Sequence, residues 1–163
     1  MFRQMRRKNQ ELSNDETVEI LNKCTNGTLA LLTDEGYTYA VPLSYVYNDG
    51  KIYFHGAKEG LKTDAIKNHN KVSFAVVEKD MIVPKEYTTY FRSVVVFGTI
   101  KIIENKAEKI DVLNMLVKKY SPDFVKYSQE EIDKLIDNVG IICLDIEKMT
   151  GKEAIELVRA RQK

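Results

Sequence analysis

The chain has 163 residues, of which 44% are hydrophobic, so it is long enough for one globular domain, residues 1–163, with a substantial core. Its 25 Lys and Arg side chains balance 24 Asp and Glu, and the net charge of +1 creates no long-range field for nucleic acid. No segment approaches signal-peptide composition or the ~20 apolar residues of a membrane helix. We therefore expect a cytoplasmic protein that binds neither nucleic acid nor membranes.

The two cysteines, Cys24 and Cys143, are far apart in sequence and each lies among apolar residues. Disulfides are unusual in the cytosol. With only His55 and His69 to join them, the cysteines lack the close ligand spacings of a zinc site. We interpret both as small buried hydrophobic side chains and expect no metal.

The first predicted element is a helix over residues 14–24. Ser13 and Glu16 have the spacing of a capping box, and apolar residues follow at helical intervals. Residues 25–27, Thr-Asn-Gly, end this helix.

Downstream, six segments have the alternation or the β-branched and aromatic content of strands. They are residues 28–33, 37–47, 51–55, 71–78, 92–104 and 139–147. Short glycine-containing turns join the first three strands into an antiparallel meander.

Helices are predicted in the remaining segments. They cover residues 61–68, a helix capped by Asn105, a helix opened by a second capping box at 128–131, and an amphipathic stretch at 152–160. Runs of strands with helices between them, without regular βαβ alternation, indicate a mainly β fold. We expect an antiparallel, nearly closed barrel with outer helices.

The densest cluster of candidate ligand-binding residues is the segment 53–62, Tyr-Phe-His-Gly-Ala-Lys-Glu-Gly-Leu-Lys. It joins the end of a strand to the start of a helix, whose free N–H groups and positive end favour an anion. Gly56 and Gly60 allow close approach, and Lys58 or Lys62 can neutralise a phosphate. Strand-Gly-helix connections are common, so the alternative is an ordinary solvated turn.

Two further positions have local patterns compatible with binding. Arg92 and Ser93 open the most apolar strand, where a cation beside a hydroxyl can bind an acidic group, although a solvated strand end is the simpler interpretation. Pro42 cannot donate to a ladder, so its segment is expected to be an edge, a bulge or a place where a ligand meets the backbone. The tyrosines at 39, 45 and 47 share one face and are expected to pack.

The sequence contains no defensible Ser-His-Asp set, and its paired carboxylates have the positions of capping and turn residues. His55 is the one histidine placed to donate a proton, and a structural role at the strand end is equally compatible with its position. If the protein is an enzyme, a bound cofactor should carry the chemistry.

Several ordered blocks along almost the whole chain resemble the pyridoxamine-phosphate-oxidase-like flavoproteins, and in particular their nitroimidazole-resistance branch. The blocks are Met5-Arg6-Arg7-Lys8, Gly27 to Ala30, Ala40 to Tyr47, Ile52 to Lys62, Tyr90 to Gly98, and Thr150 to Glu153. The resemblance implies a six-stranded split β-barrel that forms a homodimer with two FMN molecules between the subunits.

By position, the resemblance also implies three groups of FMN-binding residues. Pro42, Leu43, Ser44 and Tyr45 would lie along the isoalloxazine; His55, Gly56, Ala57, Lys58, Gly60, Leu61 and Lys62 would hold the phosphate and ribityl chain; Arg92, Ser93 and Lys152 would complete the site near the interface. His55 and Arg92 are the candidate catalytic residues, because this branch is associated with reduction of a nitro group to the amine.

Two functions remain open at this point. The first is an FMN-dependent reductase or oxidase of a small organic molecule, with NAD(P)H as a candidate electron donor. The second is a split barrel that carries, senses or stores flavin or haem without turnover.

Overall fold

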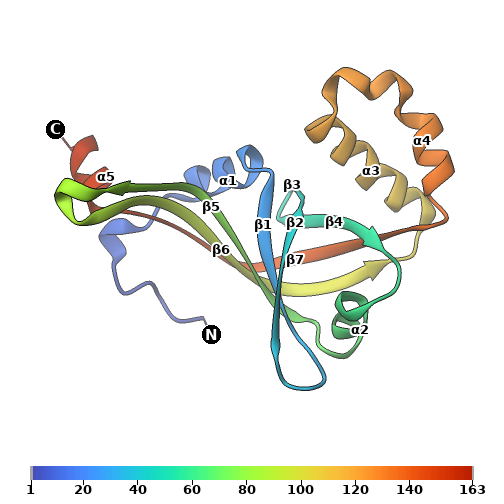
Figure 1. Ribbon diagram of the computed structural model, residues 1–163, viewed down its shortest axis with the longest axis horizontal. Coiled ribbons are helices and arrows are strands. Elements are labelled where there is room, and N and C mark those ends of the chain that lie inside the picture. The colour runs from blue at the N-terminus through green and yellow to red at the C-terminus, as the bar shows by residue number, and fades with distance from the viewer. Residues whose placement is uncertain (1, 163) are drawn as a thin grey trace.

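The computed structural model describes residues 2–162, apart from the side chain of Tyr127, as one antiparallel sheet with helices packed around it (Figure 1). The strands are β1 Asn26–Leu32, β2 Thr38–Ser44, β3 Val46–Asn48, β4 Lys51–Ala57, β5 Lys71–Val83, β6 Thr88–Ile103 and β7 Val139–Glu153. The α-helices are α1 Asn14–Lys23, α2 Leu61–Asn68, α3 Lys106–Tyr120, α4 Ser128–Leu135 and α5 Ile155–Arg161, and the short 3₁₀ helices are η1 Lys8–Gln10, η2 Pro84–Glu86 and η3 Pro122–Tyr127.

The strands follow the order β2-β1-β5-β6-β7-β4-β3, and every neighbouring pair is antiparallel. The two ends of this order curl towards each other, so that β2 approaches β4 without pairing with it. A sheet that closes without a ladder between its outer strands is a split barrel. The predicted mainly β split barrel is therefore confirmed.

The barrel interior is filled by aromatic and branched side chains from opposite walls. The Phe74 ring packs edge-on against both Tyr45 and Phe54, with ring centroids 5.0 Å and 5.2 Å apart, and all three side chains are fully buried. Helix α1 closes one opening with Ile20 and Leu21. Such edge-to-face packing adds to the free energy gained by removing the rings from water.

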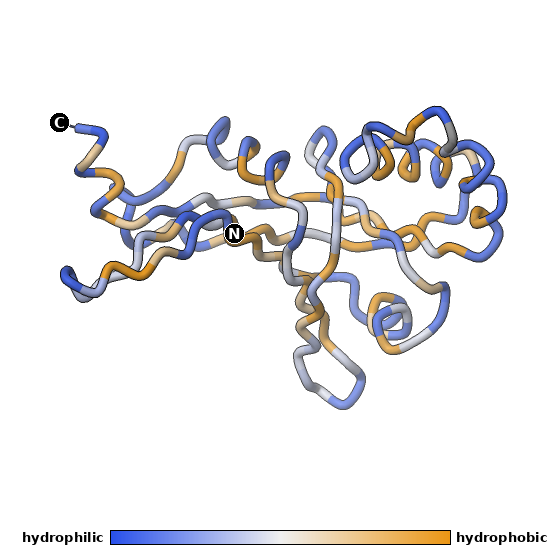
Figure 2. Tube along the Cα trace, turned by 45° about the horizontal axis from the view of Figure 1, so that its top comes forward, coloured by the Kyte–Doolittle hydropathy of each residue, from blue (hydrophilic) through white to orange (hydrophobic). Residues whose placement is uncertain are grey.

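A second apolar cluster fixes the helical insertion between β6 and β7 to the outside of the barrel. Val112 and Leu116 of α3 pack against outward-facing side chains of β4 and β7, among them Tyr53 and Cys143. The hydropathy trace in Figure 2 shows the apolar side of α3 and α4 facing the strands and their polar side facing solvent. Helices α3 and α4 therefore form a lobe, residues 106–135, beside the end of β4.

The predicted helix starts are confirmed at two positions. The Ser13 hydroxyl accepts a hydrogen bond from the Glu16 amide at 3.2 Å, while the Glu16 carboxylate accepts one from the Ser13 amide at 2.9 Å. Asn105 caps α3 through the amide of Glu108 at 3.0 Å. The second predicted capping box is wrong, because the chain enters α4 directly from η3 and the Ser128 hydroxyl donates to the Val125 carbonyl instead.

Three predicted boundaries differ from the structure. The single strand predicted at 37–47 is divided at Tyr45 into β2 and β3, so the sheet has seven strands. The strands β5 and β6 extend into a hairpin arm beyond the barrel (Figure 1). The final helix begins after Glu153 rather than at 152, because residues 150–153 still pair with β6. No helix among residues 2–162 is long and apolar enough to cross a membrane.

Candidate functional site

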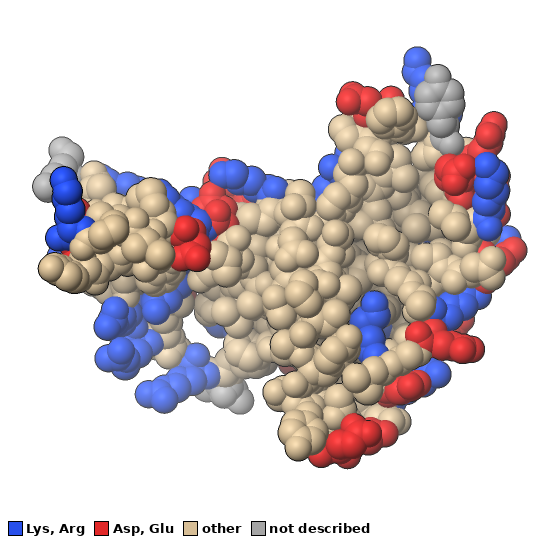
Figure 3. Space-filling model, viewed as in Figure 1, with Lys and Arg blue, Asp and Glu red and all other residues tan. Residues whose placement is uncertain are grey.

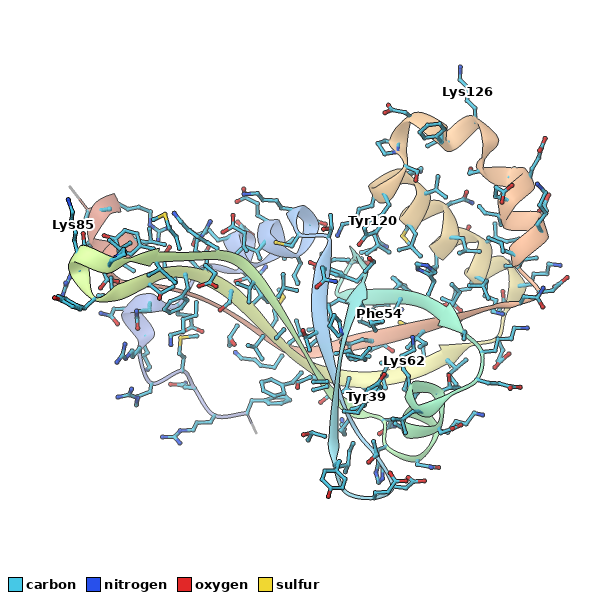
Figure 4. All side chains as sticks on the ribbon, viewed as in Figure 1. Tyr39, Phe54, Lys62, Lys85, Tyr120 and Lys126 are labelled. Atoms are coloured by element: carbon cyan, nitrogen blue, oxygen red, sulfur yellow. The ribbon has the colours of Figure 1, made fainter. Side chains whose placement is uncertain are left out.

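The connection from β4 to α2 leaves room for a ligand beside a lysine. Gly56 is on the same side of β4 as Phe54, because side chains alternate along a strand. A methyl group at position 56 would come within 2.7 Å of the Lys62 Nζ, so the ammonium group lies directly over this glycine. Figure 4 shows Lys62 between α2 and the barrel strands, near Phe54.

Lys62 carries a partly buried charge without a protein partner. Within residues 2–162 its ammonium group has no carboxylate within ion-pair distance and no hydrogen-bond acceptor. Burial lowers the pKa of Lys62, because desolvation penalises the charged form. Lys58 differs, since its ammonium group donates to the Asp137 carbonyl.

The start of α2 is open to an anion. Gly60 is the N-cap residue with φ of 120°, a conformation that favours glycine, and no side chain caps the helix. The first amide groups of α2 are therefore free of side-chain acceptors, next to the Lys62 ammonium. Gly56, Gly60, Lys62 and the α2 N-terminus form what we call the anion seat, and a phosphate group fits its donors and charge.

A cavity of about 420 Å³ lies on the other side of β4, under the lobe of α3 and α4. It is lined by Ser44, His55, Leu113, Leu116, Val117, Tyr120, Ser121, Ser128, Glu131, Ile132, Leu135 and Val139. We call this cavity the lobe chamber. It brings together the predicted site residues Ser44 and His55, which come from the ends of β2 and β4. Figure 3 shows that the middle of this face of the molecule is uncharged.

One tyrosine ties the lobe to the barrel at the edge of the chamber. The Tyr120 hydroxyl accepts a hydrogen bond from the Tyr45 amide at 2.8 Å and lies 2.7 Å from the Tyr45 carbonyl and 2.6 Å from the Thr25 carbonyl, to one of which it donates. Burial raises the pKa of Tyr120, so the hydroxyl keeps its proton.

The Pro42–Tyr45 segment offers a ligand no exposed aromatic ring, because Tyr45 is fully buried. Pro42 is exposed opposite Thr28, and Leu43 packs against the core. The Tyr45 ring is fully buried, and its hydroxyl donates to the Leu21 carbonyl at 2.8 Å. The expectation that this tyrosine packs is confirmed.

Arg92 lies in a different part of the subunit, within a group of ion pairs. Its guanidinium nitrogens are each 3.6 Å from a carboxylate oxygen of Glu16, Glu78 and Glu153, and the Glu153 side chain is only 3% exposed. Arg161 pairs with both Glu16 and Glu153. Arg92 is therefore neither a solvated strand end nor a free cation.

One subunit does not bring Arg92 and His55 together. On β7, Glu153 is opposite Arg92 and Ile141 is opposite His55, which separates the two sites by roughly 40 Å of extended strand. Ser93 and Lys152 face each other beside Arg92, and the Lys152 ammonium lies 5.3 Å from the centre of the Phe91 ring. A role for this group in the site requires a second subunit and stays a prediction.

The sequence predicts an anion site at the β4–α2 connection and a role for His55, and both stay predictions, but it does not indicate the walls of the chamber. The apolar wall residues Leu113, Leu116, Val117, Ile132 and Leu135 all lie in segments that the sequence predicts only as helices. No local signal distinguishes a helix face that packs completely from one that leaves a cavity, because the difference depends on where the lobe lies against β4.

The incompletely closed antiparallel barrel places the chain in the class of split-barrel proteins. The chain belongs to the pyridoxamine 5'-phosphate oxidase family, whose family model matches residues 13–153. No curated protein matches the chain at a significant level.

Solved structures share the fold at low sequence identity. A candidate 5-nitroimidazole antibiotic resistance protein of Bacteroides thetaiotaomicron is 23% identical, with a TM-score of 0.75 over 88% of this chain and 86% of that chain. The conserved protein Rv2991 of Mycobacterium tuberculosis is 17% identical, with a TM-score of 0.80 over 92% and 90%. The flavocytochrome Anf3 of Azotobacter vinelandii is 21% identical, with a TM-score of 0.76 over 93% and 72%.

Proposed function

We propose that this protein binds FMN and reduces small organic molecules such as nitroimidazoles and other nitroaromatic compounds. The observation that carries the proposal is the partly buried Lys62 ammonium group, which lies over Gly56 without an acidic partner beside the open start of α2. Partial burial of a cation without an acidic partner costs free energy, and a bound phosphate offsets that cost.

In this proposal, different residues contact different parts of FMN. Lys62 and the first amides of α2 hold the phosphate, Gly56 and Gly60 allow its close approach, and Ala57, Lys58 and Leu61 shape the connection around it. The backbone edge of Pro42 to Ser44 borders the ring system. When bound, FMN supplies the transfer of electron pairs, for which a reduced nicotinamide is a candidate source.

His55 has the position of a proton donor in the same proposal. His55 is one of the residues that line the lobe chamber. It directly precedes Gly56 on β4, and the Lys62 ammonium group lies over Gly56. An imidazole can donate a hydrogen bond or a proton to a group being reduced. A His55→Ala protein that binds FMN normally and reduces nitroaromatics at the parent rate would remove His55 from the mechanism.

A homodimer is part of the proposal because one outer face of the sheet contains a group of neighbouring uncharged side chains. Small and apolar side chains are adjacent across β2, β1, β5 and β6 on this face: Ala30, Ala40, Ser73, Ala75, Val77, Val95 and Phe97. Val77 is 62% exposed and Phe97 is 40% exposed. A contiguous apolar face of this kind is typical of a protein interface, and a second copy of the chain would bury it.

The alternative function is a carrier or sensor of flavin or haem without turnover. The similarity in fold to a flavocytochrome supports it. Identification of the small molecule released by denaturing the purified protein separates flavin from haem, and oxidation of a reduced nicotinamide in the presence of a nitroaromatic compound separates an enzyme from a carrier.

The anion seat is tested with Lys62→Met, with Lys67→Met as the matched control on the same helix. Loss of a charge-assisted contact of about 1.5–3 kcal/mol should weaken FMN ten- to a hundredfold in a fluorescence titration, while the Lys67 variant binds normally. Because burial disfavours the charged form of Lys62, the substitution should not lower the free energy of unfolding of the flavin-free protein. Unchanged FMN affinity in Lys62→Met would show that the seat is misplaced.

A further inference from the structure

None of the described residues that line the lobe chamber carries a positive charge. Its apolar lining residues are Leu113, Leu116, Val117, Ile132, Leu135 and Val139, and its polar lining residues are His55, Glu131, Tyr120 and three serines. The walls therefore combine a large apolar surface with a few hydrogen-bonding groups, as small-molecule pockets do.

Glu131 is the one carboxylate among the described residues that line the chamber, and it is paired with a lysine. Glu131 accepts a hydrogen bond from the Lys134 ammonium at 2.8 Å, and both side chains are 65% exposed. This pair is at the solvent side of α4 and does not offer a free charge to a ligand. A compensated, hydrated pair has little influence on what enters an apolar cavity.

The neighbouring cations point elsewhere. The Lys119 ammonium lies 4.1 Å from the centre of the Tyr45 ring and donates to the Leu21 carbonyl at 3.4 Å. The Lys62 ammonium is over Gly56, on the opposite side of β4 from His55. The chamber consequently has no uncompensated fixed charge of either sign among the described residues that line it.

We infer that the lobe chamber is the substrate site of the proposed flavoprotein and that it selects uncharged ring compounds carrying a hydrogen-bond acceptor. An anionic ligand would lose its water in the chamber without gaining a cation, whereas an uncharged ring gains contact with the apolar walls. The inference rests on the proposed function, and it predicts that phosphorylated or carboxylated rings, including the pyridoxamine phosphate of the family's name, are excluded.

The test is direct binding, measured by equilibrium dialysis on the protein as purified and again after FMN is added. The two probes are para-nitrobenzyl alcohol and para-nitrobenzoate, which have nearly the same shape and differ in charge. The measurement is made at about pH 8.5, where ordinary histidine side chains are neutral. We expect the alcohol to bind at least tenfold more tightly than the benzoate.

Substitutions of Leu135, which lines the chamber, test whether the selectivity for uncharged ligands arises there. Leu135 is 53% exposed on α4, so substitutions there should leave the fold intact. Leu135→Lys adds a cation to the wall and should strengthen benzoate binding at least fivefold, while the matched uncharged variant Leu135→Gln should not. Equal binding of the two probes by the parent protein, or benzoate binding that is unaffected by Leu135→Lys, would overturn the inference.

The outcomes also separate this inference from the proposed function. Dialysis detects binding without turnover, so charge selectivity that responds to Leu135→Lys supports the chamber even if no reduction occurs. Normal FMN binding together with unselective binding of the probes would contradict the chamber and leave the anion seat standing. If adding FMN abolishes binding of the alcohol, the flavin ring itself occupies the chamber and the inference is wrong.

Discussion

Arg92 shares its charge among three carboxylates, and this arrangement predicts a structural role for it within the subunit. Arg92→Met would leave the buried Glu153 with Arg161 as its remaining partner. Removing one partner of a buried ion pair destabilises proteins by about 3–5 kcal/mol when the other charge is left unpaired, but Arg161 still pairs with Glu153, so we expect a smaller loss of about 1–2 kcal/mol in urea unfolding.

Arg159→Met is the matched control, because Arg159 is exposed on α5 and should change the unfolding free energy by less than about 0.5 kcal/mol. An Arg92→Met protein that is as stable as its parent but binds ligand poorly would instead support the direct role in the site that the sequence suggested.

The two cysteines should be chemically inert in the folded protein. Cys143 is fully buried, and burial raises its pKa to about 11, while burial also raises the pKa of the half-buried Cys24. In a Cys24→Ser protein at about pH 7.5, Cys143 should react with a disulfide reagent about a hundredfold more slowly than an ordinary thiol with a pKa of ~8.5.

The sign of the pH dependence follows from the raised pKa. The unfolded chain loses the thiol proton above about pH 8.5 and the folded chain retains it up to about pH 11, so this group makes folding less favourable as the pH rises through that window. Rapid labelling of Cys143 at neutral pH without unfolding would contradict the burial on which this prediction depends.

The helical lobe is held to the barrel at a few places, and one of them is the Tyr120 hydroxyl. Tyr120→Phe removes its hydrogen bonds and leaves the Tyr45 amide without its partner, at a cost of about 1–3 kcal/mol. We expect faster amide hydrogen exchange in residues 106–135, with protection retained in β5 and β6.

Tyr87→Phe is the control for this change, because Tyr87 is 97% exposed in the arm and its hydroxyl is free to bond with water. If exchange in the lobe is the same in the Tyr120 and Tyr87 variants, the apolar contacts of α3 alone position the lobe. Since the lobe forms one wall of the chamber, a looser lobe should also weaken binding of para-nitrobenzyl alcohol.

At the level of the whole molecule, we predict that flavin binding and dimerisation are linked. If the flavin site is built from both subunits, it exists only in the dimer, so FMN must stabilise that dimer. The gain is RT ln(1 + [L]/Kd) per site, about 2.7 kcal/mol when free FMN is a hundred times Kd. Sedimentation over a range of protein concentrations, with and without FMN, should show a lower dissociation constant with FMN.

A charge on the apolar outer face should separate the subunits. Ala75→Glu places a carboxylate in the middle of that face, whereas Ala107→Glu makes the same substitution at an exposed position of α3. Only the first should give a monomer with weakened FMN binding. A parent protein that remains monomeric and binds one FMN tightly at all dilutions would contradict both the interface and the linkage.

Much of the architecture is determined locally by the sequence. The capping box at Ser13 and Glu16 defines the start of α1, and alternation identifies the barrel strands, because burial on one face of a strand requires an apolar residue at every second position. The glycines and lysines of the β4–α2 connection likewise predict the anion seat from the sequence, since their chemistry is independent of distant residues.

The tertiary structure alone decided three features. The break between β2 and β3 is fixed by the hydroxyl of Tyr120, which is distant in the sequence from Tyr45. The β5–β6 arm escaped prediction because its half-exposed side chains lack strict alternation. The chamber and the separation of Arg92 from His55 depend on how the lobe and the long strands lie in space, and residues close in sequence carry no information about such contacts.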